Sequence, residues 1–190
     1  QPLCAGAEGI DVNESLMELL LLIRRLKLAR AGRVTAMVPY FAYSRQDRKT
    51  ELREPISAAA VARLLTQMGV DSVLTLDLHS GQIQGTFQSI SMDNLWMRQE
   101  FAQCLRERLP LTDPSAKIAV VSPDAGGVDR AKKLADLLNI DQIVTIVKRR
   151  AVAGQVAQMQ TVGTVSGYIC VIVDDIVDTG GTLAKACNLL

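Results

Sequence analysis

The chain has 190 residues, enough to bury a hydrophobic core as one domain or as two small ones. Apolar residues make up 48% of it and charged residues 22%, a balance that is typical of folded globular proteins and excludes a disordered chain. The formal net charge of +1 excludes broad electrostatic binding to nucleic acid or membranes, so an anion site must come from a local cluster of cations. The longest strongly apolar run, Leu19–Ile23, is far too short to span a bilayer.

Apolar segments with strand-like composition alternate with helix-like segments along the chain. This alternation predicts an α/β fold with mainly parallel sheets covered by helices on both faces. In chain order we expect a helix over Asn13–Ala31, a strand over Val34–Val38, a helix over Pro55–Gly69, a strand over Ser72–Leu78, a helix over Trp96–Leu109, a strand over Lys117–Val121, a helix over Gly127–Asn139, strands over Ile143–Val147 and Ile169–Val173, and the start of a helix after Gly181.

The first expected helix has Ser15 and Glu18 in capping-box spacing. Its run Leu19–Ile23 is apolar on every face, which predicts burial in a core or in an oligomer contact. A faint repeat then relates Val34–Pro39 to Ile118–Pro123, each followed by a loop and a helix. Two related α/β units of about ninety residues would explain the repeat. The alternative is that any two strand–loop–helix units look alike.

The four cysteines are scattered and show neither metal-ligand nor redox spacing. Cys170 lies in a strand-like run and is expected to be a buried thiol. No signal peptide is visible, and a reducing compartment is the simplest inference, so we expect a cytoplasmic protein.

The most informative segment is Ile169–Thr182, an apolar strand that ends in Asp174 and Asp175 and continues into a loop of Asp, Thr and Gly. The two carboxylates can accept hydrogen bonds from sugar hydroxyls or hold a metal. The loop Asp178–Thr182 offers hydroxyls and backbone N–H groups to a phosphate at the start of a helix. The segment therefore predicts a site for a phosphorylated sugar; the alternative is an ordinary strand–turn–helix with exposed acids.

Four further clusters follow expected strands. Ser44–Lys49 carries three cations that suit phosphate oxygens, although such a run is more often simply solvated. Asp77 and His79, two residues apart on a strand, could ligate a metal; the alternative is a satisfied surface histidine.

Asp124, followed by Gly126 and Gly127, could hold Mg²⁺ together with substrate oxygens, or could mark only a tight turn. Lys148–Arg150 precedes a small-residue stretch, Ala151–Gln160, that we interpret as a mobile flap; its cations could stabilise charge during phosphate transfer or merely flank a hairpin. All five clusters lie at the carboxyl ends of strands, where open parallel sheets bind ligands.

Together these segments closely resemble the ribose-phosphate diphosphokinase (phosphoribosyl pyrophosphate synthetase) family. The resemblance runs from about Asn13 to the end of the chain, and the order and spacing of its blocks make it specific. The matching blocks are Asn13–Leu20, Tyr43–Lys49, Arg53–Ser57, Leu76–Gly85, Met92–Leu95, Val121–Gly127, Lys148–Arg150 and Ile169–Thr182.

The resemblance implies two tandem phosphoribosyltransferase-like domains with mainly parallel sheets flanked by helices. Residues 1–98 would form the ATP-side domain and residues 99–190 the ribose 5-phosphate-side domain. It also implies transfer of a pyrophosphoryl group from ATP to the anomeric hydroxyl of ribose 5-phosphate, with Mg²⁺ as cofactor and self-association into dimers and hexamers.

Carried onto this chain, the family pattern assigns a role to each cluster. Mg²⁺ would be organised by His79 and Asp124, and the transferring group would be stabilised by Lys148 and Arg150. ATP would be contacted by Arg45, Gln46 and Asp47. Ribose 5-phosphate would be held by Asp174, Asp175, Asp178, Thr179, Gly180, Gly181 and Thr182.

The chain departs from the family pattern in three places. Ala151–Gly154 replaces further basic residues and an Asn, and Thr86 and Gln88 replace an aromatic residue and an Asp in a regulatory stretch. Family members also begin earlier and continue further, so we expect a fragment with both domains incomplete. The competing readings are a phosphoribosyltransferase and a catalytically silent subunit that regulates an active synthetase.

Overall fold

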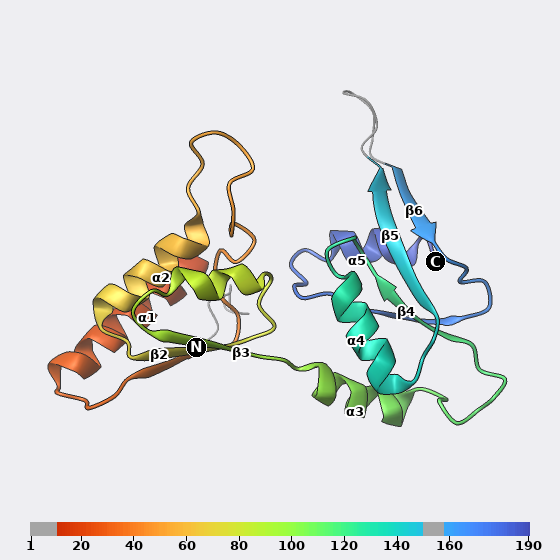
Figure 1. Cartoon of the computed structure of the whole chain (residues 1–190), viewed down its shortest axis with the longest axis horizontal. Helices are drawn as coiled ribbons and strands as arrows, with labels where there is room; N and C mark the ends of the chain where they lie inside the picture. The colour runs from red at the N-terminus through yellow and green to blue at the C-terminus, as the bar shows by residue number, and fades with distance from the viewer. Residues whose placement is uncertain (1–10, 150–157) are drawn as a thin grey trace. The chain divides into compact units, whose positions relative to one another are not determined.

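The computed structural model describes residues 11–149 and 158–190 (Figure 1). The chain divides into two compact units, the first ending at Trp96 and the second beginning at Met97. The expected boundary after residue 98 falls in the first turn of helix α3 (Arg98–Arg108), whereas the units separate just before this helix. Each unit has a mainly parallel sheet flanked by helices, which confirms the predicted α/β class.

The first unit contains a three-stranded parallel sheet in the order β1–β2–β3, with α1 and α2 packed against each other (Figure 1). Its core joins these helices to the strands through side chains such as Ile23, Leu65 and Val73, each at most 1% exposed. Its elements are α1 (Val12–Leu28), β1 (Thr35–Val38), α2 (Ser57–Met68), β2 (Ser72–Leu76), the 3₁₀ helix η1 (Gly81–Thr86) and β3 (Ser91–Leu95).

One face of the first sheet is open in the part of the unit that the structure describes. Along β1, Ala36 and Val38 are buried, whereas Thr35 and Met37 are exposed, and Leu95 at the end of β3 is also exposed. The expectation of helices on both faces is therefore wrong for this part of the unit. The short strand β1 alternates in burial, which is the behaviour of a strand with only one covered face.

The capping box of α1 lies one turn earlier than predicted. Asp11 is the N-cap: its carboxylate accepts from the N–H of Asn13 at 3.1 Å, and Glu14 accepts from the N–H of Asp11 at 3.0 Å. Ser15 is instead buried inside the helix. Both pairs have the same three-residue spacing, so the pattern alone did not distinguish them.

The run Leu19–Ile23 contributes only some of its side chains to the core of this unit, and burial of the others in an oligomer contact stays a prediction. Leu19, Leu20 and Ile23 are buried, whereas Leu21 and Leu22 are exposed.

The second unit contains a four-stranded sheet in the order β6–β5–β4–β7, in which only β6 runs antiparallel to its neighbour. The central strand β4 is buried along its whole length, with Val120 packed on α4 and Val121 in the cluster that includes Ala186 of α5. Its elements are α3 (Arg98–Arg108), β4 (Ile118–Ser122), α4 (Val128–Leu138), β5 (Ile143–Arg149), β6 (Gln158–Val162), β7 (Ile169–Ile172) and α5 (Gly181–Cys187).

Strand β7 is less buried than its apolar sequence predicts. It lies at one edge of the described sheet, and Cys170, Val171 and Ile172 are all half-buried. An apolar run does not distinguish an edge strand from a central one. No helix within residues 11–149 and 158–190 has the length and hydropathy needed to cross a membrane.

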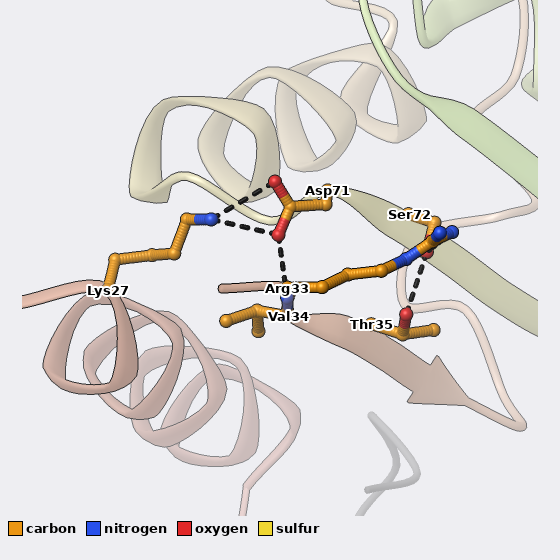
Figure 2. Close-up of polar contacts among 6 residues, drawn as sticks. All are labelled: Lys27, Arg33, Val34, Thr35, Asp71 and Ser72. Atoms are coloured by element: carbon orange, nitrogen blue, oxygen red, sulfur yellow. Dashed lines mark hydrogen bonds and ion pairs between the residues drawn. The ribbon is translucent and has the colours of Figure 1, made fainter. Parts of the chain in front are cut away.

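Asp71 ties three elements of the first unit together at the amino end of its sheet (Figure 2). Its carboxylate accepts from the Lys27 ammonium at 2.8 and 3.0 Å and from the backbone N–H of Val34 at 2.6 Å. Its own N–H donates to the Val34 carbonyl at 2.9 Å. The hydrogen bonds from Lys27 and Val34 hold the pKa of Asp71 below its ordinary value.

We expect Asp71→Ala to destabilise the first unit more than Lys27→Ala. The Asp71 change removes the ion pair and also leaves the N–H of Val34 without its carboxylate partner, whereas the Lys27 change removes only the ion pair. Thermal unfolding should show a melting temperature several degrees lower for Asp71→Ala and a smaller decrease for Lys27→Ala.

Asp129→Asn is the control, because the exposed Asp129–Lys133 pair of α4 should contribute little.

The effect of Asp71→Asn should also depend on pH. Because the folded pKa of Asp71 is lowered, its stabilisation is present above the ordinary value of 3.8 and is lost as the pH falls through the lower folded value. Equal losses in Asp71→Ala and Lys27→Ala would contradict a role for Asp71 beyond the ion pair.

Candidate functional site

Parallel pairing gives each unit one edge at which the carboxyl ends of its strands meet. In the first unit this edge carries the loop of residues 39–56 after β1 and the turn Asp77–His79 after β2. In the second unit it carries the turn after β4 and the loop after β7.

The loop after β1 is held at several points. The Tyr43 hydroxyl donates to the side-chain oxygen of Asn13, and the N–H of Ala58 in α2 donates to the carbonyl of Gln46 at 3.2 Å. Tyr43 and Arg53 have positive φ angles of 60° and 67°, which side chains seldom adopt without surrounding constraints. The backbone of the loop is therefore organised, while its cations Arg45, Arg48 and Lys49 are exposed.

The predicted ATP residues lie in this loop. Arg45 and Gln46 are exposed and Asp47 is half-buried. A pocket of about 330 Å³ opens beside them. It is lined by Arg45, Gln46, Arg48, Thr50, Glu54 and Pro55.

The turn after β2 differs from the prediction. The strand ends at Leu76, and Asp77 adopts a left-handed conformation with φ of 41°, so the expected strand geometry that would place Asp77 and His79 on one side is wrong. The end of β3 fixes the turn: Asp77 N–H donates to the Leu95 carbonyl at 2.9 Å, and Leu78 N–H donates to the Asn94 side chain at 3.0 Å. His79 is exposed in this turn.

In the second unit, Asp124 sits in a tight turn after β4. Its carboxylate accepts from the N–H of Gly127 at 2.9 Å, and its carbonyl accepts from the hydroxyl of the fully buried Ser122 at 2.6 Å. A side chain at Gly127 would place its Cβ 2.7 Å from that hydroxyl. Gly127 is therefore needed for close approach, and the turn leaves the Asp124 side chain exposed.

Asp174 and Asp175 follow β7 at the same edge, and the N–H of Val173 donates to the Val121 carbonyl of β4 at 3.0 Å. Burial, together with the side-chain contact and charge of Asp175 and the charge of Asp124, raises the pKa of Asp174 to about 6. The backbone N–H of Asp175, which donates to Asp174 at 2.9 Å, offsets only part of this. The structure thus brings Asp124 close enough to Asp174 for its charge to be felt there.

The expected phosphate loop connects these aspartates to α5. Asp178, Thr179 and Gly181 are exposed, whereas Gly180 and Thr182 are half-buried. Gly180 has φ of 75° and caps α5, a conformation for which glycine is suited. The loop therefore places the exposed residues Asp178 and Thr179 between the two aspartates and α5, which begins at the exposed Gly181.

The predicted catalytic cations lie near the limit of the described chain. Lys148 belongs to β5, where its backbone is paired with Met159 of β6, and Arg150 lies outside the described residues. Most of the expected flap, Ala151–Gln160, also lies outside them. Its last three residues belong to β6, so the stretch ends in a strand that the sequence did not predict.

A magnesium site agrees with the chemistry of the second unit. Within residues 11–149 and 158–190, no three His, Cys, Asp or Glu side chains are grouped so that they could hold a metal alone. Mg²⁺ bound with substrate phosphates needs only one or two carboxylates. Burial is the main reason that ionisation of Asp174 is disfavoured, and the charges of Asp175 and Asp124 add to it, so a bound cation would relieve the repulsion among the three carboxylates. The donor set therefore fits Mg²⁺.

The sequence did not reveal which residues support the site. Asn94, Ser122 and Glu54 hold turns through hydrogen bonds to residues that are close in space or in the same loop. For Glu54 the four-residue spacing to Thr50 was a usable signal. The partnership of Asn94 with Leu78 depends on the pairing of β2 with the unpredicted strand β3.

Comparison with known proteins agrees with this arrangement. Residues 1–69 match the family described as the N-terminal domain of ribose phosphate pyrophosphokinase, and residues 99–190 match the phosphoribosyl transferase domain. A ribose-phosphate pyrophosphokinase of Bradyrhizobium diazoefficiens is 48% identical over 182 residues, which are 96% of this chain and 56% of that protein. The chain belongs to the ribose-phosphate pyrophosphokinase family.

Other members of the family are similarly close. Ribose-phosphate pyrophosphokinase 3 of Saccharomyces cerevisiae is 45% identical over 179 residues, 94% of this chain and 54% of the yeast protein. The crystal structure of phosphoribosylpyrophosphate synthetase from Mycobacterium smegmatis superposes with a TM-score of 0.84 at 40% identity, over 94% of this chain and 56% of that one. The chain thus spans about half the length of the relatives it matches.

We expect Gly127→Ala to destabilise the second unit by about 1–3 kcal/mol, since the new Cβ displaces the Ser122 hydroxyl from the Asp124 carbonyl. Ser122→Ala should also destabilise it, because that carbonyl loses its donor. The double variant should cost less than the sum of the two, because removal of the hydroxyl removes the clash. Urea unfolding of the four proteins measures this coupling, and strictly additive effects would contradict the proposed contact.

We expect Asp174→Asn to stabilise the fold while weakening ligand binding at the edge of the second sheet. A carboxyl whose folded pKa is raised contributes its stability below its ordinary pKa of 3.8 and loses that stability as the pH rises through about 6. The melting temperature of Asp174→Asn should therefore exceed that of the unmodified protein above pH 6, and the gain should vanish in acid near pH 3.8. A gain that is constant with pH would contradict the raised pKa.

Proposed function

We propose that this chain supplies the substrate-binding edges of an enzyme that makes 5-phosphoribosyl 1-pyrophosphate and AMP from ATP and ribose 5-phosphate. The observation that carries the proposal is the edge of the second sheet, where Asp174 and Asp175 lead into a partly exposed Thr-Gly-Gly-Thr loop and the charge of Asp124 reaches Asp174. Relatives named ribose-phosphate pyrophosphokinase support it and do not favour a phosphoribosyltransferase or a silent subunit.

The second unit would bind ribose 5-phosphate. Ionised carboxylates accept hydrogen bonds, so Asp174 and Asp175 suit the ribose hydroxyls. The loop Asp178–Thr182 would surround the 5-phosphate with hydroxyl and backbone N–H donors, as phosphate loops do at the start of helices.

The first unit would bind ATP through the loop after β1. Arg45 and Gln46 line the pocket and can donate to phosphate and base acceptors, and Asp47 can accept from nucleotide donors. Mg²⁺ would be organised near the phosphates by Asp124, which belongs to the second unit, and by His79, which belongs to the first. When bound, the ion neutralises phosphate charge and orients the phosphates.

The reaction would be an in-line displacement at the β-phosphorus of ATP. The anomeric hydroxyl oxygen forms a bond to this phosphorus and loses its proton to water. The bond from the phosphorus to the oxygen bridging to the α-phosphorus breaks, so AMP leaves with that oxygen. Lys148 and Arg150 would stabilise negative charge as it develops on the transferring group. Positioning and charge stabilisation supply most of the catalysis in such transfers.

We also propose that the protein self-associates into dimers and hexamers and acts in the cytoplasm, as the family resemblance implies. Equilibrium sedimentation tests the first of these proposals.

The proposed activity is tested by AMP formation from ATP, Mg²⁺ and ribose 5-phosphate with the protein expressed from its complete gene. Lys148→Ala should lower kcat by about 10²–10³, the usual cost of losing one group that stabilises transition-state charge. Lys117→Ala is the matched control, because Lys117 precedes β4 at the opposite edge of the same sheet. A folded protein that forms no AMP would overturn the proposal, and equal losses in both variants would overturn the role of Lys148.

A further inference from the structure

The loop after β1 contains a carboxylate oxygen with three donors. Oε2 of Glu54 accepts from the N–H of Thr50 at 3.1 Å, from the hydroxyl of Thr50 at 2.9 Å and from the N–H of Glu51 at 3.1 Å. These bonds connect the end of the loop, just before Pro55, to its middle. Glu54 therefore closes residues 50–54 into a turn.

This turn is part of the wall of the cationic pocket. Thr50 and Glu54, which the hydrogen bonds join, both line the pocket that Arg45, Gln46 and Arg48 also line. The remainder of the loop is attached elsewhere, through the Tyr43–Asn13 contact and the bond from Ala58 to Gln46. The hydrogen bonds of Glu54 thus hold the part of the loop that follows Lys49. A change at Glu54 should alter the part of the pocket lining that Thr50 and Glu54 form.

The charge of Glu54 does not make it a ligand for a polyphosphate. A carboxylate beside a phosphate would be repelled, unless its charge is compensated by donors. The hydroxyl and backbone donors of Thr50, followed by the N–H of Glu51, lower the pKa of Glu54, so the ionised form is the one that holds the turn.

We propose that Glu54 is a positioning residue for the triphosphate of ATP, holding the turn 50–54 so that the pocket of Arg45, Gln46 and Arg48 is formed before the nucleotide binds. The proposal rests on the ATP role proposed for this loop. Pre-formed sites avoid the entropy cost of ordering a loop on binding. Loss of the turn should therefore weaken ATP binding without changing the reacting groups.

The test is steady-state kinetics on the protein expressed from its complete gene. Glu54→Ala should raise KM for ATP about tenfold, the usual effect of losing a charge-assisted hydrogen-bond set, with kcat and KM for ribose 5-phosphate within about twofold. Glu54→Gln retains an oxygen that can accept from the same donors and should recover much of the ATP affinity. Glu51→Ala is the matched control, because it removes the same charge from the same turn but keeps the backbone donor.

Tryptic cleavage gives a second measurement that needs no activity. The loop contains Arg45, Arg48, Lys49 and Arg53, so trypsin reports directly on its opening. Glu54→Ala should be cleaved faster than the unmodified protein within residues 45–53, and Glu54→Gln and Glu51→Ala should not.

The outcomes separate this proposal from the proposed activity. An unmodified protein that forms no AMP overturns the activity, and the cleavage experiment then still decides whether Glu54 holds the turn. An active protein whose Glu54→Ala variant keeps the KM for ATP, or raises both KM values equally, overturns the positioning role. Equal effects of Glu51→Ala and Glu54→Ala would also overturn it, because they would indicate a general charge effect.

Discussion

Parallel pairing of neighbouring strands is the constraint on which the rest of the structure depends. In the second unit the register pairs Val121 of β4 with Ile172 of β7, and the next hydrogen bond joins Val173 to Val121. This places the turn that begins at Ser122 beside the loop that begins at Asp174, although some fifty residues separate them in the sequence. Two aspartates that are unrelated in sequence thus share one edge, and the charge of Asp124 adds to the burial that raises the pKa of Asp174.

This arrangement has an energetic cost. The ionised form of Asp174 is disfavoured by burial and by Asp175 and Asp124, so the fold would be more stable without that charge. Interactions far from the edge offset such costs, among them the fully buried strand β4 and its packing against α4 and α5. Strain at a ligand-binding edge combined with a well-packed interior is the usual compromise between stability and activity.

Sequence reasoning recovered the features that depend on local pattern. The buried strand β4, the alternation of strands and helices and the position of Asp174 after β7 follow from apolar runs and turn residues. Prediction from sequence failed where the local structure depends on residues that are distant in the sequence. The polar strand β3 is held by pairing with β2, and the open face of the first sheet depends on which helices pack there, not on composition. The conformation of Asp77 likewise reflects a hydrogen bond from its N–H to Leu95, a partner that only the unpredicted strand supplies.

The two units share one arrangement of strands and loops but carry different side chains at its edge. In each, a strand leads into a loop and then a helix, and the next parallel strand brings a second polar segment to the same edge. In the first unit the loop is cationic and its pocket is lined by Arg45 and Arg48, whereas in the second the edge carries Asp124, Asp174 and Asp175. Cationic side chains suit phosphate oxygens, and carboxylates suit sugar hydroxyls or a divalent cation. In both units the parallel sheet brings the loops that follow its strands to one edge, and the residues of those loops decide the chemistry of that edge.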